Sequence, residues 1–173
     1  VLCVAKHNRF AKQYHKLAEK LGIQERITWH YALSQEELLQ WLAHAKLSVA
    51  PLADCDRNTL QGCCPLKILE SMSLGVPVVA SDLPVVKEIL SHGKHGHVCR
   101  AGRAPDLARV LRVLLESPEY LQQLGQNAKQ HIENNFTWEQ SKNRLKELYH
   151  ARSSVGLTHS DSGELDTCLS KQL

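Results

Sequence analysis

Short apolar runs alternate with segments of helical periodicity along residues 1–115, and this alternation constrains the fold more than any other feature. Runs of strand length lie at residues 1–5, 27–30, 47–50 and 76–80, with one more short strand at 97–99. Between them, apolar side chains recur at helical spacing. Strands that alternate with helices predict a parallel, doubly wound α/β sheet.

Start and stop signals mark the helices between these strands. Gly22 ends the first helix, which begins at residue 11. Ser34 and Glu37 form a capping box that opens the second helix, and Pro65 begins the helix that runs to residue 74. Four more helices are expected, at residues 85–90, 105–115, 118–132 and 137–151, the last with the start signal Thr137–Gln140.

Mainly polar segments follow the carboxyl ends of four of the predicted strands. These segments are Lys6–Asn8, Tyr31, the loop at residues 52–64, and Ser81–Asp82. In open parallel sheets, ligands bind in the crevice outside the carboxyl ends of the strands. The sequence therefore predicts that these segments face one crevice, although the fold by itself does not say what binds there.

Lys67 and Glu70 are the candidate functional pair in the helix that begins at Pro65. They are three residues apart, so they project together from one side of the helix. A lysine in the first turn is unfavourable, because it lies at the positive end of the helix macrodipole. An anion bound at the helix start, where free backbone N–H groups also point, would make a lysine favourable there. A diphosphate is such an anion, and Glu70 is placed to accept hydrogen bonds from a ribose. The alternative is a solvated surface ion pair.

Residues 65–72 and 75–82 read PLKILESM and GVPVVASD, and they resemble the signature of the family 4 glycosyltransferases. Enzymes of this family have the GT-B fold, which consists of two Rossmann-like domains. The signature belongs to the C-terminal, donor-binding domain, and the resemblance covers residues 1 to about 149. It implies a Rossmann-like doubly wound parallel sheet, the C-terminal half of a GT-B glycosyltransferase.

The resemblance also assigns roles to individual residues. Glu70 matches the second glutamate of a Glu-x7-Glu motif and would bind the nucleotide ribose. The first glutamate, which helps to hold the donor sugar, is replaced here by Gly62. Lys67 matches a lysine of one branch of the family, so that Lys67 and Glu70 are the expected catalytic residues. The turn that contacts the donor sugar and phosphates corresponds to Cys63, Cys64, Pro65 and Leu66.

Tyr31 and Arg57 are further candidates for the donor site, whereas the clusters of Asp and His residues are not expected to bind a metal. Tyr31 replaces the glycine usual after the second strand and is expected at the donor site, as is Arg57 in the loop, although a loop arginine is more often solvated. Asp54 and Asp56 have the spacing of a metal motif, but no metal is expected in a flexible loop of this fold. His92, His95 and His97 alternate with Gly93 and Gly96, which favours a tight turn over a metal site.

The expected organisation is a nucleotide-sugar-binding domain at residues 1–152 and a disordered tail at residues 153–173, which is rich in Ser, Asp and Gly. The chain opens in a strand-like run without an initiator Met. We therefore expect a piece of a longer enzyme, without the family's first strand and helix of this domain and without its N-terminal acceptor domain. Such a piece is expected to be inactive alone.

The function implied by the resemblance is transfer of a sugar, of the hexosyl type, from a nucleoside diphosphate donor to an acceptor with retention at the anomeric carbon. The expected acceptor is a glycan or a lipid-linked sugar, and no cofactor or metal is implied. Two alternatives stay open, a nucleotide-sugar epimerase of the same fold and a non-catalytic nucleotide-binding module. Turnover by the full-length protein would separate a transferase from such a module.

Composition excludes several other classes of protein. The formal net charge is only +3, without the clustered Lys and Arg of a nucleic-acid-binding surface. No run approaches the roughly 18 apolar residues of a membrane span. The six cysteines include no Cys-x-x-Cys pair, which argues against a zinc site. A reducing compartment is the simpler expectation for these cysteines. The expected location is the cytoplasm, with any membrane contact made through the N-terminal domain.

Overall fold

The computed structural model describes residues 1–154, which contain five strands, eight α-helices and one 3-10 helix. The strands are β1 (Leu2–Ala5), β2 (Thr28–Tyr31), β3 (Ser48–Ala50), β4 (Val78–Ser81) and β5 (Gly96–Cys99). The α-helices are α1 (Asn8–Lys20), α2 (Gln35–Ala43), α3 (Asp56–Thr59), α4 (Leu66–Ser73), α5 (Pro84–Lys87), α6 (Ala104–Leu115), α7 (Pro118–Asn135) and α8 (Trp138–Ser154). The 3-10 helix is η1 (Gln24–Arg26).

Every strand and helix predicted from the sequence has a counterpart in this structure, with ends that differ by a few residues. The sequence did not predict η1 or α3. The single turn of α3 lies inside the loop at residues 52–64 and has no apolar periodicity that would reveal it. It is held by Asn58, which is buried and donates a hydrogen bond from Nδ2 to the carbonyl oxygen of Ala53 at 2.7 Å.

Residue contacts divide the chain into two compact units, Val1–Glu133 and Asn134–Leu173. In the second unit, α8 begins with the expected reciprocal cap. The Thr137 backbone N–H donates to Oε1 of Gln140 at 2.9 Å, and the Gln140 backbone N–H donates to Oγ1 of Thr137 at 3.3 Å. The predicted domain boundary at residue 152 stays a prediction, and the disorder predicted for the tail lies outside the described residues.

All strand pairs in the first unit are parallel, as the alternation of strands and helices predicts. The strands form two sheets, with the orders β1-β2 and β3-β4-β5, where a single sheet was expected. Within residues 1–154, no strand ladder joins β1 to β3. The edge of β3 that is unpaired within these residues leaves that strand more exposed than its neighbour. Val49 on β3 is 39% exposed, whereas its partner Val79 on β4 is 1% exposed.

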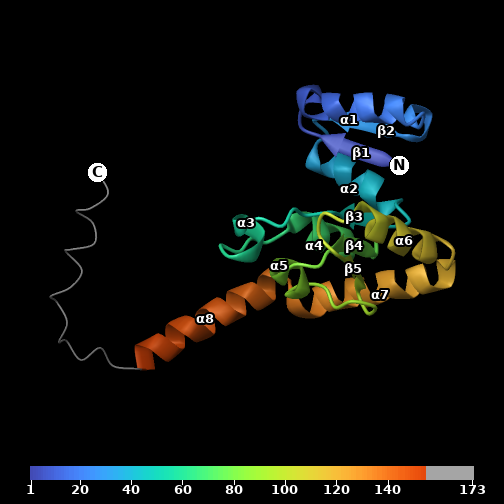
Figure 1. The fold of residues 1–173 in the computed structure, drawn as a ribbon. Coiled ribbons are helices and arrows are strands. Elements are labelled where there is room, and N and C mark those ends of the chain that lie inside the picture. The colour runs from blue at the N-terminus through green and yellow to red at the C-terminus, as the bar shows by residue number, and fades with distance from the viewer. Residues whose placement is uncertain (155–173) are drawn as a thin grey trace, which may run out of the picture. The chain divides into compact units, whose positions relative to one another are not determined.

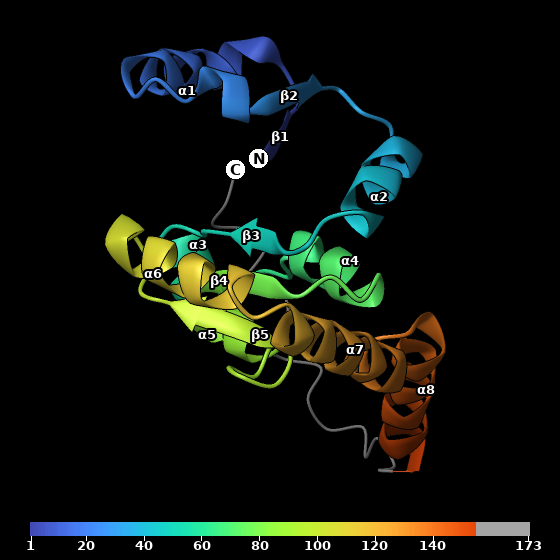
Figure 2. The same cartoon turned by 90° about the vertical axis from the view of Figure 1, so that its right-hand side faces the viewer.

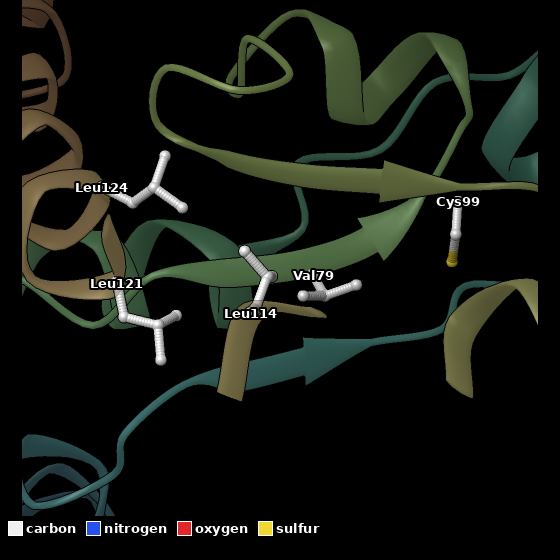
Figure 3. Packing of buried hydrophobic residues seen from close by; sticks show 5 residues of the cluster. All are labelled: Val79, Cys99, Leu114, Leu121 and Leu124. Carbon is white, nitrogen blue, oxygen red and sulfur yellow. The ribbon is translucent and has the colours of Figure 1, made fainter. Parts of the chain in front are cut away.

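The main core lies on both faces of β4, whose four residues are all buried. Figures 1 and 2 show α4 and α6 on opposite faces of the β3-β4-β5 sheet. Successive side chains of a strand point to opposite faces. On the face covered by α6 and α7, a cluster is formed by Val79, Cys99, Leu114, Leu121 and Leu124 (Figure 3). Ile68 and Met72 of α4 are fully buried.

Two glycines allow backbones to approach closely in this core. A Cβ atom added to Gly125 of α7 would lie 2.1 Å from the carbonyl oxygen of Gly75, which ends α4. A Cβ atom added to Gly96 of β5 would lie 2.3 Å from the carbonyl oxygen of Val78 on β4. Both contacts are with backbone atoms, which cannot move aside as a flexible side chain would. The packing of α7 and β5 therefore depends on these two glycines.

The segment before β5 is the tight turn expected from the glycine spacing. Gly93 has a φ of +75°, and its backbone N–H donates to the carbonyl oxygen of Gly96 at 2.8 Å. In the described residues, no group of three or more His, Cys, Asp or Glu side chains could hold a metal ion.

His95 is 4% exposed and stacks on His131 of α7, with ring centroids 3.9 Å apart. Burial, together with the charges of His131 and Lys94, lowers the pKa of His95 to about 4.

We expect Gly125→Ala to destabilise the protein by about 1–3 kcal/mol, the usual cost of overpacking. Alanine has a higher helix propensity than glycine, so the same substitution at an uncrowded helix position would instead raise the free energy of unfolding by about 1 kcal/mol. Urea denaturation measures the difference. Gln126→Ala, at the exposed next position of α7, is the matched control and should change stability little. A Gly125→Ala protein as stable as the parent would contradict the close contact.

We also expect stability to fall as the pH falls from about 6.5 to about 4, because the folded state binds a proton at His95 less readily than the unfolded chain, whose pKa is near 6.5. The contribution of neutral His95 is complete above this range and is lost through it. Melting temperatures across the range should show a weaker pH dependence for His95→Gln. His44→Gln, at an exposed position, should keep the parent's dependence, and an unchanged slope in His95→Gln would refute the assignment.

Candidate functional site

The predicted capping box at the start of α2 is present. The backbone N–H of Glu37 donates to Oγ of Ser34 at 3.2 Å, and the Ser34 backbone N–H donates to Oε2 of Glu37 at 2.8 Å. The hydrogen bonds from the Ser34 backbone and side chain lower the pKa of the Glu37 carboxyl. This cap fixes the first turn of α2, and with it the position of Gln35, the first residue of the helix.

Gln35 contacts the candidate site directly. Its Nε2 donates a hydrogen bond of 2.9 Å to Oε1 of Glu70 on α4, across 35 residues of sequence. The second carboxylate oxygen of Glu70 has no hydrogen bond within the described residues, so it can accept one from a ligand. Sequence reasoning missed Gln35, and the capping box was the only signal near it. The box shows where the helix begins but not which helix lies opposite.

Helix α4 begins close to the residue at which the sequence predicts it. Pro65 is buried and occupies the N-cap position, so the helix begins one residue later than predicted, at Leu66. The Leu66 backbone N–H donates to the carbonyl oxygen of Cys64 at 2.9 Å. Lys67 is exposed in the first turn, and among the described residues no ion pair joins it to Glu70. The surface ion pair is therefore not formed here.

The loop before α4 is anchored at its beginning and in its middle. Oγ of Ser81, at the end of β4, donates to the carbonyl oxygen of Leu52 at 2.7 Å. Further along, the buried Asn58 accepts a hydrogen bond of 3.2 Å from Sγ of Cys63. Arg57 is on α3 and is exposed. The structure thus places the loop, with Arg57, Cys63 and Cys64, between the carboxyl end of β3 and the start of α4.

Gly62, at the position of the motif's first glutamate, has a φ of +77°. This left-handed conformation favours glycine over any residue with a side chain. A Cβ atom added there would meet no heavy atom within 4 Å, so the site is open and not crowded. The conformation of the loop explains why a glycine is suitable at this position, and no neighbouring glutamate of the loop replaces the missing carboxylate.

Tyr31 is the last residue of β2, and its place at the donor site stays a prediction. Its hydroxyl is hydrogen-bonded to Nε2 of His15 on α1, within the β1-β2 part of the molecule. The structure brings together three parts of the predicted crevice, which are Ser81, the loop at residues 52–64 and α4. Gln35 of α2, which was not predicted, also contacts α4. Tyr31 and the segment after β1 belong to the other sheet, because β1 and β3 are not paired. An open groove of about 590 Å³ lies along α1, and no residue of α4 lines it.

The sequence profile of the family described as glycosyl transferases group 1 matches residues 2–131. The chain belongs to this family. A related protein is the D-inositol 3-phosphate glycosyltransferase of Streptomyces bingchenggensis (strain BCW-1), 28% identical over 138 residues, which cover 80% of this chain and 29% of the relative. The chain thus spans less than a third of the length of this group 1 relative.

Two solved structures share the fold of this chain. The sucrose-phosphate synthase of Thermosynechococcus elongatus superposes with a TM-score of 0.75 and 20% identity, covering 90% of this chain and 39% of that one. Anabaena Alr3699/HepE in complex with UDP and glucose gives a TM-score of 0.74 and 18% identity, covering 87% and 40%. The Rossmann-like half of the GT-B fold is therefore confirmed. No described helix is long and apolar enough to cross a membrane.

The hydrogen bond from Gln35 to Glu70 should couple α2 to α4. We expect a double-mutant cycle with Gln35→Ala and Glu70→Ala to give a coupling energy of about 0.5–1.5 kcal/mol, the usual net value of one hydrogen bond. Chemical denaturation of the parent, the two single variants and the double variant provides this coupling energy. Gln40→Ala, on the exposed side of the same helix, should show no coupling to Glu70→Ala. Independent effects of Gln35→Ala and Glu70→Ala would mean that the contact is not formed.

Proposed function

We propose that this chain binds the nucleoside diphosphate part of a nucleotide-sugar donor for a group 1 glycosyltransferase. The observation that carries the proposal is the half-buried Glu70, which Gln35 holds at 2.9 Å while one carboxylate oxygen stays open. A ribose offers two adjacent hydroxyl donors to such an oxygen. The Leu66 and Ile68 backbone N–H groups donate within the chain, so the neighbouring first turn of α4 offers the Lys67 backbone N–H and the Lys67 ammonium to the diphosphate.

The residues around this pair have complementary tasks in the proposal. The backbone of Cys63, Cys64, Pro65 and Leu66 lies against the phosphates and the donor sugar. Arg57, on α3 in the loop that leads to α4, adds a second cation. As the glycosidic bond to the leaving diphosphate breaks, negative charge grows on its oxygens. Lys67 and the helix N-terminus stabilise that charge electrostatically, without proton transfer to the phosphate.

For the longer protein, we propose transfer of a hexose with retention at the anomeric carbon, to a glycan or lipid-linked acceptor, without a cofactor or a metal. The acceptor would be held by an N-terminal domain of the GT-B fold. In Alr3699/HepE the bound molecules are UDP and glucose, which supports a nucleotide-sugar donor of this type. The five cysteines within the described residues are all free thiols, which supports a reducing compartment such as the cytoplasm.

We expect Glu70→Gln to weaken the binding of UDP by about 1–3 kcal/mol, because a charged acceptor of the ribose hydroxyls is replaced by a neutral amide. Isothermal titration calorimetry with UDP provides the dissociation constants. Glu116→Gln, at an exposed position after α6, is the matched control and should bind like the parent. Equal affinities for the parent and Glu70→Gln would rule out the ribose assignment. No measurable binding by the parent would contradict the proposal as a whole.

A further inference from the structure

Two cysteines of the loop at residues 52–64 share one buried partner. Sγ of Cys63 donates to Oδ1 of Asn58 at 3.2 Å, and Nδ2 of the same amide donates to Sγ of Cys55 at 3.5 Å. Asn58 is only 8% exposed, whereas Cys55 is exposed and Cys63 is half-buried. The two sulfur atoms, eight residues apart in the sequence, therefore lie at the two ends of a single amide group.

We propose that Cys55 and Cys63 form a thiol–disulfide modification site, which a low-molecular-weight disulfide such as oxidised glutathione converts into an intramolecular disulfide. Both thiols can be reached from solvent, as the reaction requires. The backbone between them is easily rearranged, since it consists of the single turn of α3 and a glycine at position 62 with a φ of +77°. Asn58 keeps the two sulfurs close to each other but apart in the reduced state.

The chemistry needs no partner beyond the oxidant named. The thiolate of one cysteine attacks a sulfur of oxidised glutathione, forms a mixed disulfide and releases one glutathione thiolate. The second cysteine, as its thiolate, then attacks the protein sulfur of the mixed disulfide and releases the second glutathione. Two protein thiols are oxidised to one disulfide, and one glutathione disulfide is reduced to two thiols. The protons leave the cysteines and end on glutathione.

The other cysteines are less suited to this reaction. Cys64 is exposed, but in the described residues no hydrogen bond joins its sulfur to Asn58. Its Cα atom is about 3.8 Å from that of Cys63, as between any neighbours, which is shorter than the roughly 4.4–6.8 Å of ordinary disulfides. Cys99 is buried, and its Sγ contacts the carbonyl oxygen of Ala80. Cys3 is half-buried on β1, in the other sheet.

Formation of the bond has a consequence for the loop. The Asn58 amide must leave the space between the sulfurs, and this side chain also holds the loop to Ala53. The change reaches α4, because Cys63 is two residues before Pro65 at the start of that helix. Oxidation is therefore expected to weaken ligand binding at α4. This part of the inference rests on the proposed function, whereas the disulfide itself does not.

The test is incubation of the full 173-residue chain with oxidised glutathione, followed by alkylation of free thiols and peptide mapping by mass spectrometry. The expected product is a Cys55–Cys63 disulfide that dithiothreitol reverses. In Cys63→Ser, Cys55 should instead retain one glutathione. Cys64→Ser and Cys168→Ser are controls, and both should still form the disulfide. A Cys63–Cys64 or Cys55–Cys64 bond, or glutathione on Cys64 with Cys55 and Cys63 still reduced, would overturn the proposal.

Calorimetry with UDP on the reduced and oxidised chains tests the effect on binding. We expect the oxidised chain to bind at least about fivefold more weakly, the lower end of usual coupling between sites. Equal affinities would contradict the coupling of the disulfide to α4. If neither form binds UDP but the Cys55–Cys63 bond forms, the proposed function fails and the modification site stands. If UDP binds and the bond does not form, the reverse holds.

Discussion

The burial of β4 between β3 and β5 is the constraint on which the first unit depends. All four residues of β4 are buried, and its two faces are covered by helices from different parts of the chain. Close packing of this kind tolerates no extra atoms, which is why Gly96 and Gly125 lie where a Cβ would overlap a backbone oxygen. The parallel direction of the three strands then brings their carboxyl ends to one edge. At that edge, Ser81 holds the beginning of the loop that leads to α4.

The candidate site depends on local hydrogen bonds that place side chains for contacts with other parts of the chain. The Ser34–Glu37 capping box satisfies backbone groups at the start of α2, which is a purely local task. Because it also fixes Gln35, this side chain is in place to meet Glu70 once packing brings α2 and α4 together. A similar relation holds in the loop, where the amide of Asn58 links Ala53, Cys55 and Cys63. Gln35 and Glu70 are 35 residues apart, whereas Asn58 acts inside one loop, on residues three to five positions away.

The strand order explains how two sheets arise from one pattern of strands and helices. In the usual doubly wound order, 3-2-1-4-5-6, strands 2 and 3 lie on one side of strand 1 and strands 4 to 6 on the other. The orders β2-β1 and β3-β4-β5 correspond to these two groups. One parallel strand between the free edges of β1 and β3 would join them. The exposure of Val49 on β3 shows that this edge is uncovered within the described structure.

The sequence by itself determined the strands, the helices other than α3 and η1, the parallel arrangement, the caps at Ser34 and Thr137, and the family, because these depend on local periodicity and on short motifs. It also pointed to the start of α4, although the roles of Lys67 and Glu70 stay predictions. Only the tertiary structure decided that Gln35 meets Glu70, that Tyr31 contacts His15, and that one amide lies between two cysteine sulfurs. The first two contacts join residues on separate elements, whose distance depends on packing that no local pattern encodes. The third depends on the path of a loop without apolar periodicity.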